Sequence, residues 1–185
     1  LLNHIAKKNI VFLYQGPLDK NRGISNVLEA FSKLEEKNWS LVIVGGNPRQ
    51  VEILQTEFCN ESIFFTGFTT QSEVFSYMEL ADIGLLALRN TCLNNYYTAP
   101  NKLYEYMQCG CAVLGPDFDG VNKFILSNKI GYVTDFDSPC AIRKTVEGIL
   151  GKHKKTLEAM RKKSKALSAD YTWKESEQIL KKLYN

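Results

Sequence analysis

Short apolar runs alternate along the chain with longer stretches in which apolar residues recur every three or four positions. An apolar run bounded by turn residues predicts a buried strand, and the three-to-four spacing predicts an amphipathic helix. Strands are therefore expected at residues 9–15, 41–44, 62–66, 82–88, 111–114 and 130–134. Helices are expected at residues 24–37, 48–58, 70–80, 100–108, 120–127 and from 138 to the end, with breaks near Gly151 and Asp170.

This alternation predicts an α/β fold, with a parallel sheet of about six strands and helices on both faces in a three-layer, Rossmann-like arrangement. We expect a single domain over residues 1–185, in which 152–185 form a C-terminal helical segment. Ligands of such sheets bind beyond the carboxyl ends of the strands. The loops to search for a site are therefore 16–23, 45–47, 67–70, 89–102 and 115–120, and residues 89–99 are expected to lack regular structure.

Several common uses of this architecture leave sequence motifs that are absent here. The first strand is not followed by G-x-G-x-x-G, and no G-x-x-x-x-G-K-[ST] occurs, which argues against a nicotinamide dinucleotide fold and a P-loop NTPase. A G-x-S-x-G nucleophile elbow is also missing. Gln15, Gly16 and Pro17 stand where a phosphoacceptor receiver domain would carry acidic residues.

One candidate segment, residues 14–23, joins the first strand to the first helix. Gly16 allows backbone to approach a ligand closely, and the start of the helix offers free amides to a phosphate. Arg22, beside Gly23, would add a forked cation that suits a diphosphate. The alternative is an ordinary turn with a solvated arginine.

A second candidate lies at the start of the helix predicted for 100–108, where Lys102 and Glu105 share one face. A cation in the first turn of a helix is unfavourable unless an anion lies opposite it. The carboxylate one turn further on can accept two hydrogen bonds from a ribose diol. The alternative is an exposed ion pair between the two side chains, worth about 0.3 kcal/mol.

Composition limits the remaining choices. The net charge of +3 is too small to predict a nucleic-acid partner. The five cysteines are odd in number and lack C-x-x-C, and neither His4 nor His153 lies at metal-ligand spacing from them, so we expect reduced thiols, a cytoplasmic location and no metal. No apolar run approaches the ~18 residues of a membrane span. Because the chain starts at Leu1 without a signal-peptide pattern, we expect a fragment of a longer protein.

Taken in order, these segments resemble the donor-binding domain of the family-4 retaining glycosyltransferases of GT-B architecture. The matching segments are 16–23, Val44-Gly45-Gly46, Phe65-Thr66-Gly67-Phe68, Ala81-Asp82-Ile83-Gly84-Leu85, Pro100-Asn101-Lys102-Leu103-Tyr104-Glu105-Tyr106-Met107, Gly131-Tyr132-Val133 and Tyr171-Thr172-Trp173. The resemblance implies the C-terminal half of a two-domain enzyme of polysaccharide biosynthesis. That enzyme would transfer a sugar from a nucleotide diphosphate to an acceptor with retention.

The resemblance also implies roles for individual residues. Arg22, Lys102, Gly16, Asn101 and Leu103 would hold the donor diphosphate, the last two through their amides. Glu105 would bind the ribose, and Phe68 with Gly67 would contact the base of a UDP- or GDP-type donor. The family's first glutamate is replaced by Tyr97 and its second basic residue by Pro17, so both the sugar contacts and the usual diphosphate clamp depart from the family pattern. Catalytic groups on the acceptor side would lie in the N-terminal acceptor domain, so the isolated fragment is expected to be inactive.

Other interpretations stay open. The same half could come from a GT-B sugar-nucleotide epimerase, or from a non-catalytic α/β module. Residues 152–165 are strongly basic, which fits either a solvated helix face or weak docking on anionic lipid at the inner face of the membrane. In the family, the final helix crosses back toward the N-terminal domain. The base, the sugar, the acceptor and the linkage are not specified by the sequence.

Overall fold

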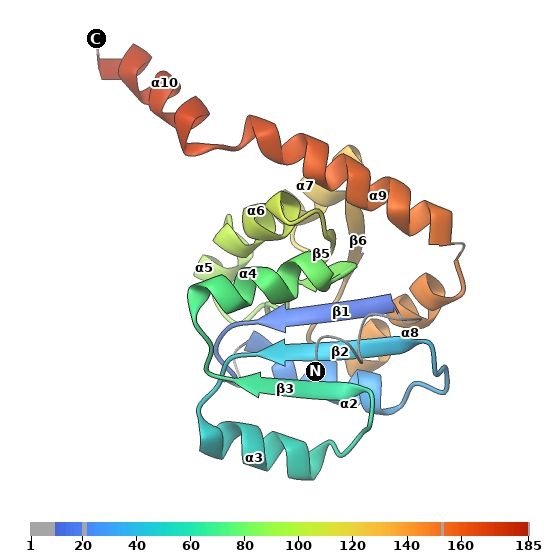
Figure 1. The fold of residues 1–185 in the computed structure, drawn as a ribbon. Coiled ribbons are helices and arrows are strands. Elements are labelled where there is room, and N and C mark those ends of the chain that lie inside the picture. The colour runs from blue at the N-terminus through green and yellow to red at the C-terminus, as the bar shows by residue number, and fades with distance from the viewer. Residues whose placement is uncertain (1–9, 20–21, 153, 185) are drawn as a thin grey trace.

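The computed structural model describes residues 10–19, 22–152 and 154–184 (Figure 1). Its six strands form one parallel sheet in the order β3-β2-β1-β4-β5-β6. The strands are β1 (Ile10–Gln15), β2 (Trp39–Val44), β3 (Ile63–Gly67), β4 (Ile83–Leu85), β5 (Ala112–Pro116) and β6 (Gly131–Thr134). The helices are α2 (Ile24–Ser32), α3 (Pro48–Glu57), α4 (Gln71–Leu80), α5 (Leu93–Tyr96), α6 (Asn101–Gln108), α7 (Asp119–Asn128), α8 (Pro139–Leu150), α9 (Lys154–Leu167) and α10 (Trp173–Tyr184), with a 3₁₀ turn η2 (Ser168–Asp170).

The predicted three-layer α/β architecture is confirmed. Along β1, Phe12 and Tyr14 belong to the apolar core beneath α2, α3 and α8, whereas Val11 and Leu13 belong to the core beneath α4, α6 and α7. Successive side chains of a strand point to opposite faces, so a strand covered on both sides must be apolar throughout. All four residues are buried, which explains why the strand appears in the sequence as an uninterrupted apolar run.

Helix starts follow the capping residues. Thr70 and Glu73 form the predicted capping box at α4, and Asn47 with Gln50 forms another at α3, where Pro48 occupies the first turn. Each box satisfies two backbone groups that a helix terminus would otherwise leave without partners.

The structure differs from the predicted elements most clearly in three places. The helix expected to reach residue 37 ends at Ser32, where the Lys33 and Leu34 amides bond to carbonyls three residues back, although Leu34 still packs against the core. The strand expected over 82–88 spans only Ile83–Leu85, although the Leu86 amide still donates to the Leu114 carbonyl at 2.9 Å and the next three residues stay buried. The stretch 89–99 contains the short helix α5 (Leu93–Tyr96), which has no side-chain cap to announce it.

The C-terminal segment divides at the two predicted breaks, into α8, α9 and α10. Helix α9 is fixed by Arg161, whose guanidinium donates to Asp82 at 2.5 Å and to the Gly110 carbonyl at 3.1 Å. Helix α10 extends away from the sheet (Figure 1), with Trp173, Leu183 and Tyr184 largely exposed. Predictions for residues 1–9, residues 20–21 of the first loop, and His153 lie outside the described residues.

Candidate functional site

The candidate site lies at the carboxyl end of the sheet, where the strand order reverses between β1 and β4. Main-chain hydrogen bonds continue past the strand ends: the Gly16 amide donates to Val44 at 2.9 Å, and the Gly45 amide donates to Gly67 at 3.0 Å. A Cβ at Gly45 would collide with the Gly16 carbonyl oxygen, and φ is +121° at Gly45 and +138° at Gly16. Glycine alone lacks a Cβ and adopts these positive φ angles easily, so the loops after β1, β2 and β3 pack closely together with their backbone exposed.

Helix α6 is held directly over the point where the strand order reverses. The Tyr106 side chain is fully buried, and its hydroxyl lies 3.4 Å from the carbonyl oxygens of Leu13 and Leu85, which share its single hydrogen as acceptors. Its ring occupies the space above Gly84, where any Cβ would collide with it. The sequence predicts that Tyr104 or Tyr106 packs on the sheet, and Tyr106 is the one that does. This contact sets the position of the residues at the start of α6.

Lys102, in the first turn of α6, reaches across to the loop after β1. A Cβ at Gly16 would collide with Lys102 Nζ, which lies 5.5 Å from the centre of the Tyr14 ring. Burial lowers the pKa of Lys102 to about 8, and the charge of Arg22 lowers it as well, whereas Glu105 and Asp19 oppose the fall. A bound anion would favour the charged form of this amine.

Arg22 lines a cavity of about 260 Å³ together with Lys102, so the two predicted cations share one site. The Arg22 side chain is half-exposed, and its Nε lies 4.0 Å from Asp19 Oδ2. Gly23, the next residue, is the N-cap of α2 with φ +72° and provides no side-chain cap. The start of α2 therefore presents backbone amides close to the two cations.

The remaining predicted residues of α6 have unequal access to a ligand. The Leu103 amide already donates to the Pro100 carbonyl at 2.9 Å, so Asn101, which is exposed and lines the cavity, is the better placed amide. Glu105 is half-buried one turn further on. Among the described residues no ion pair within 4.0 Å joins it to Lys102, so the structure does not contain the exposed pair that was the alternative interpretation.

A second cavity, of about 470 Å³, lies on the other side of Gly16. Its lining includes Gly45, Gly46, Phe68 and Val74. Phe68 is 90% exposed, so its ring is free to close over a ligand. Gly67 is the last residue of β3, with φ +69°. Of the two predicted base residues, Phe68 lines this separate cavity, which shares Gly16 with the Lys102 contact, whereas Gly67 is not part of its lining.

The two departures from the family pattern occupy different positions. Tyr97 is 77% exposed and packs edge-on against Tyr96, with ring centres 5.0 Å apart; Tyr96 in turn packs on Phe118. Pro17 borders the second cavity, and its carbonyl accepts a 2.6 Å hydrogen bond from the Tyr14 hydroxyl. Neither residue brings a charge to the site.

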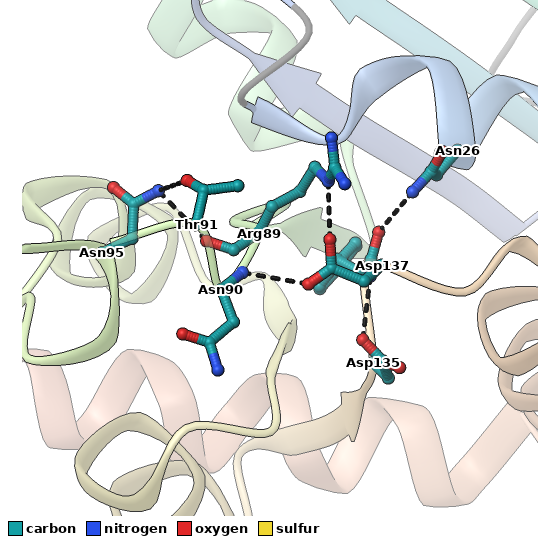
Figure 2. A network of polar contacts seen from close by, with 8 residues as sticks. Asn26, Arg89, Asn90, Thr91, Asn95, Asp135 and Asp137 are labelled. Carbon is teal, nitrogen blue, oxygen red and sulfur yellow. Dashed lines mark hydrogen bonds and ion pairs between the residues drawn. The ribbon is translucent and has the colours of Figure 1, made fainter. Parts of the chain in front are cut away.

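Several residues around the first cavity were not predicted from the sequence. Asn94, Asn95 and Thr98, all from the stretch expected to be irregular, line it beside Lys102. Arg89 pairs with Asp137 close by (Figure 2). The sequence did contain a signal for these residues: three amide and hydroxyl side chains lie within five residues, in a loop expected at the carboxyl edge of the sheet.

The prediction of no metal also rests on the absence of an Asp-x-Asp sequence, and that premise is wrong, because the chain contains two: Asp117 to Asp119 and Asp135 to Asp137. Asp117 accepts a hydrogen bond from Asn122, and Asp119 pairs with Lys123 at 3.0 Å; in the second sequence, Asp135 accepts from the Asp137 amide at 2.8 Å. Over the described ranges, no three histidine, cysteine, aspartate or glutamate side chains are grouped as metal ligands. The aspartates of both Asp-x-Asp sequences therefore bond to neighbouring polar groups of the protein.

The basic face of α9 is exposed at Lys154, Lys155, Lys162 and Lys163, whereas Leu157 is buried against the core. Outside the residues that the structure leaves undescribed, no helix is long and apolar enough to cross a membrane. Docking on anionic lipid stays a prediction.

The fold and the sequence were compared with known proteins. Over 149 residues the chain is 25% identical to a Bacillus subtilis protein named as the teichuronic acid biosynthesis glycosyltransferase TuaH, covering 80% of this chain and 36% of that one. Among solved structures, sucrose-phosphate synthase of Thermosynechococcus elongatus gives a TM-score of 0.79 at 19% identity, covering 99% of this chain and 47% of the other.

Two further structures match nearly the whole chain. The C-terminal domain of the group 1 glycosyl transferase LpcC of Francisella tularensis gives a TM-score of 0.72 at 19% identity, covering 92% of this chain and 90% of that domain. HepE of Anabaena, solved in complex with UDP, gives 0.75 at 15% identity, with 96% and 49% covered. At these identities the structures establish a shared GT-B fold.

The chain spans about a third of TuaH and about half of the sucrose-phosphate synthase and HepE chains. The sequence profile of the family described as "Glycosyl transferases group 1" matches residues 3–167, which is most of the chain. The chain therefore belongs to the group 1 glycosyl transferases.

Proposed function

We propose that this chain is the C-terminal, donor-binding half of a two-domain, family-4 retaining glycosyltransferase. The observation that carries the proposal is the meeting of Lys102 and Arg22 at one cavity, over Gly16, where the strand order reverses. Open α/β sheets bind phosphate-containing ligands at this point of the fold. HepE, of the same fold, was solved with UDP and with UDP-glucose, which supports a UDP-type donor for this chain.

In this proposal the donor diphosphate lies over Gly16, between the Lys102 ammonium and the Arg22 guanidinium. Both cations, with the Asn101 amide at the start of α6, would stabilise the negative charge that grows on the diphosphate as the sugar leaves. Glu105 would accept hydrogen bonds from the ribose hydroxyls. The base would enter the second cavity, beside Phe68.

The sugar is the part for which the family pattern gives least guidance, because Tyr97 stands in place of a glutamate. Asn94, Asn95 and Thr98 line the cavity next to Lys102, whereas the Tyr97 ring packs on Tyr96. We therefore assign the sugar hydroxyl contacts to these three side chains rather than to Tyr97.

The acceptor half would supply the other wall of the site. Helix α10 exposes Trp173, Leu183 and Tyr184 beyond the edge of the domain, and we propose that this apolar face packs on the N-terminal acceptor domain. The isolated chain would then bind nucleotide weakly and transfer almost no sugar. The LpcC match supports this division, because nearly all of a separate C-terminal domain is covered.

Titration calorimetry with UDP and GDP tests the diphosphate site. Arg22→Ala and Lys102→Ala should each weaken binding about tenfold or more, as expected for loss of a charged hydrogen bond. Lys33→Ala is the matched control, since Lys33 pairs with Glu29 on the surface of α2. Unchanged affinity for both nucleotides in both site variants would contradict the proposal.

Two alternatives keep their own tests. A sugar-nucleotide epimerase shares nucleotide recognition, so the two-domain protein must be separated from it by analysing whether the product is a transferred or an epimerised sugar. A non-catalytic module predicts no shift in melting temperature with UDP-, GDP- or ADP-sugars. The convergence of two cations on one cavity favours the transferase over that module.

A further inference from the structure

Close to the first cavity, the ion pair of Arg89 and Asp137 joins two segments that are far apart in the sequence. Arg89 Nε lies 2.6 Å from Asp137 Oδ1, and Asp137 Oδ2 accepts the Asn90 amide at 3.0 Å (Figure 2). Both carboxylate oxygens are therefore bonded. Partial burial opposes ionisation of Asp137, but the bonds from Arg89 and Asn90 outweigh it and lower the pKa of the carboxyl group. The loop after β4 is thereby tied to the loop after β6.

Each end of the pair is fixed by further hydrogen bonds. On one side, Asn95 Nδ2 donates to the Arg89 carbonyl at 3.0 Å and to Thr91 Oγ1 at 3.1 Å, which closes the turn that leads into α5. On the other side, Asn26 of α2 donates to the Phe136 carbonyl at 2.9 Å. Three segments at the carboxyl end of the sheet thus share one network.

The network also lies directly against the segment that carries Arg22. A Cβ added at Gly23 would lie 3.2 Å from Arg89 Cγ and 3.6 Å from the Phe136 carbonyl, so the Arg89 stem packs on the N-cap of α2. Arg22, one residue earlier, lines the first cavity together with Asn95. Movement of Arg89 would therefore displace both a cation and a wall of that cavity.

The network differs from an ordinary surface ion pair. Arg143 and Glu147 on α8 lie 3.5 Å apart and are 39% and 37% exposed, close to the 34% of Arg89 and Asp137. That pair spans one helical turn and ties no other segment. Because surface pairs alone contribute little, the special feature of Arg89 and Asp137 is what they hold in place.

We propose that Arg89 and Asp137 are positioning residues, which fix Arg22 and the wall at Asn95 so that the donor diphosphate is gripped. The inference rests on the proposed function. Neither residue touches the donor in this account. Loss of the pair should weaken the grip on the terminal phosphate more than the binding of the nucleoside, because the base cavity on the far side of Gly16 is untouched.

The test compares UDP with UMP, which lacks the terminal phosphate, by calorimetry and ligand-observed NMR. In Arg89→Met and in Asp137→Asn, UDP should bind about tenfold more weakly while UMP changes little, so the ratio of the two affinities falls. Arg89→Lys should restore part of that ratio. The matched control, Arg143→Met, should leave the ratio unchanged.

A double-mutant cycle identifies the route of the effect. If the pair acts through Arg22, then Arg22→Ala should weaken UDP binding less in the Asp137→Asn background than in the parent chain. Equal losses in both backgrounds, or UDP and UMP weakened alike together with a lower melting temperature, would overturn the positioning role. If the parent chain fails to bind UDP, or if Arg22→Ala has no effect in it, the proposed function fails first and the positioning role fails with it.

Discussion

Lys102 provides the sharpest test of the proposed site, because burial has changed its chemistry. Its pKa falls from the usual 10.5 to about 8, and burial is the largest cause. A diphosphate beside Nζ would favour the ammonium and raise the pKa again. If the pKa of Lys102 returns to its usual value in the complex, protonation of the amine strengthens UDP binding by about 3 kcal/mol. This follows because each pH unit between the two pKa values is worth about 1.36 kcal/mol.

The sign of the pH effect follows directly. Below pH 8 the amine of the free chain is already protonated, so UDP affinity should be flat; above it, binding must take up a proton and affinity should fall. Between pH 7 and pH 9 the loss should be about tenfold. Calorimetry over this range measures it. In Lys102→Met the same titration should be flat, apart from any ionisation of the nucleotide itself, which affects both proteins equally.

The free chain offers an independent check on Lys102. Because its pKa is lower in the folded state than in the unfolded state, the charged amine opposes folding below pH 8, and that penalty disappears as pH rises toward 10.5. Lys102→Met should therefore raise the free energy of unfolding at pH 7, by about 1–3 kcal/mol, while weakening UDP binding. Urea denaturation measures the change. A destabilised variant, or a pH-dependent affinity that survives the substitution, would refute the reasoning.

Three other predictions concern the supports of the site. Gly84→Ala would push a methyl group into the ring of the buried tyrosine of α6, and should cost about 1–3 kcal/mol in urea denaturation. Gly45→Ala should weaken UDP binding and also lower stability, because its Cβ would collide with the Gly16 carbonyl at the cavity mouth and alanine rarely adopts φ +121°; unchanged affinity would contradict this. Arg161→Met should lower stability by about 1–3 kcal/mol and leave UDP affinity unchanged, since it deprives the half-buried Asp82 of its cation far from the ligand.

The sheet could be predicted from the sequence because strands covered on both faces must be apolar, and β1 and β2 are. The same signal extended too far at Leu86, Ala87 and Leu88, which are buried and line the first cavity but lie beyond the end of β4. Hydrophobicity reports burial, and it does not distinguish burial in a sheet from burial beneath a loop.

Some residues of the candidate site could likewise be predicted from the sequence, and others could not. Arg22 and Lys102 could be proposed because each lies at or just before the start of a helix at the carboxyl edge of the sheet, where the ends of parallel strands meet. The pair of Arg89 with Asp137 could not, because 48 residues separate them and neither belongs to a local motif. Long-range side-chain partners depend on how loops pack, which a single sequence does not specify.

The backbone bonds beyond the strand ends, from Gly16 to Val44 and from Gly45 to Gly67, mean that three loops cannot open separately. A nucleotide bound to the loop after β1 would therefore also restrain the loops after β2 and β3, through these hydrogen bonds. Slower amide exchange on binding should then spread outward to β3, beyond the groups in direct contact with the nucleotide. If the proposed function holds, donor binding would in this way stiffen an entire edge of the domain, and the proposed acceptor half would meet a firmer surface once the donor is bound.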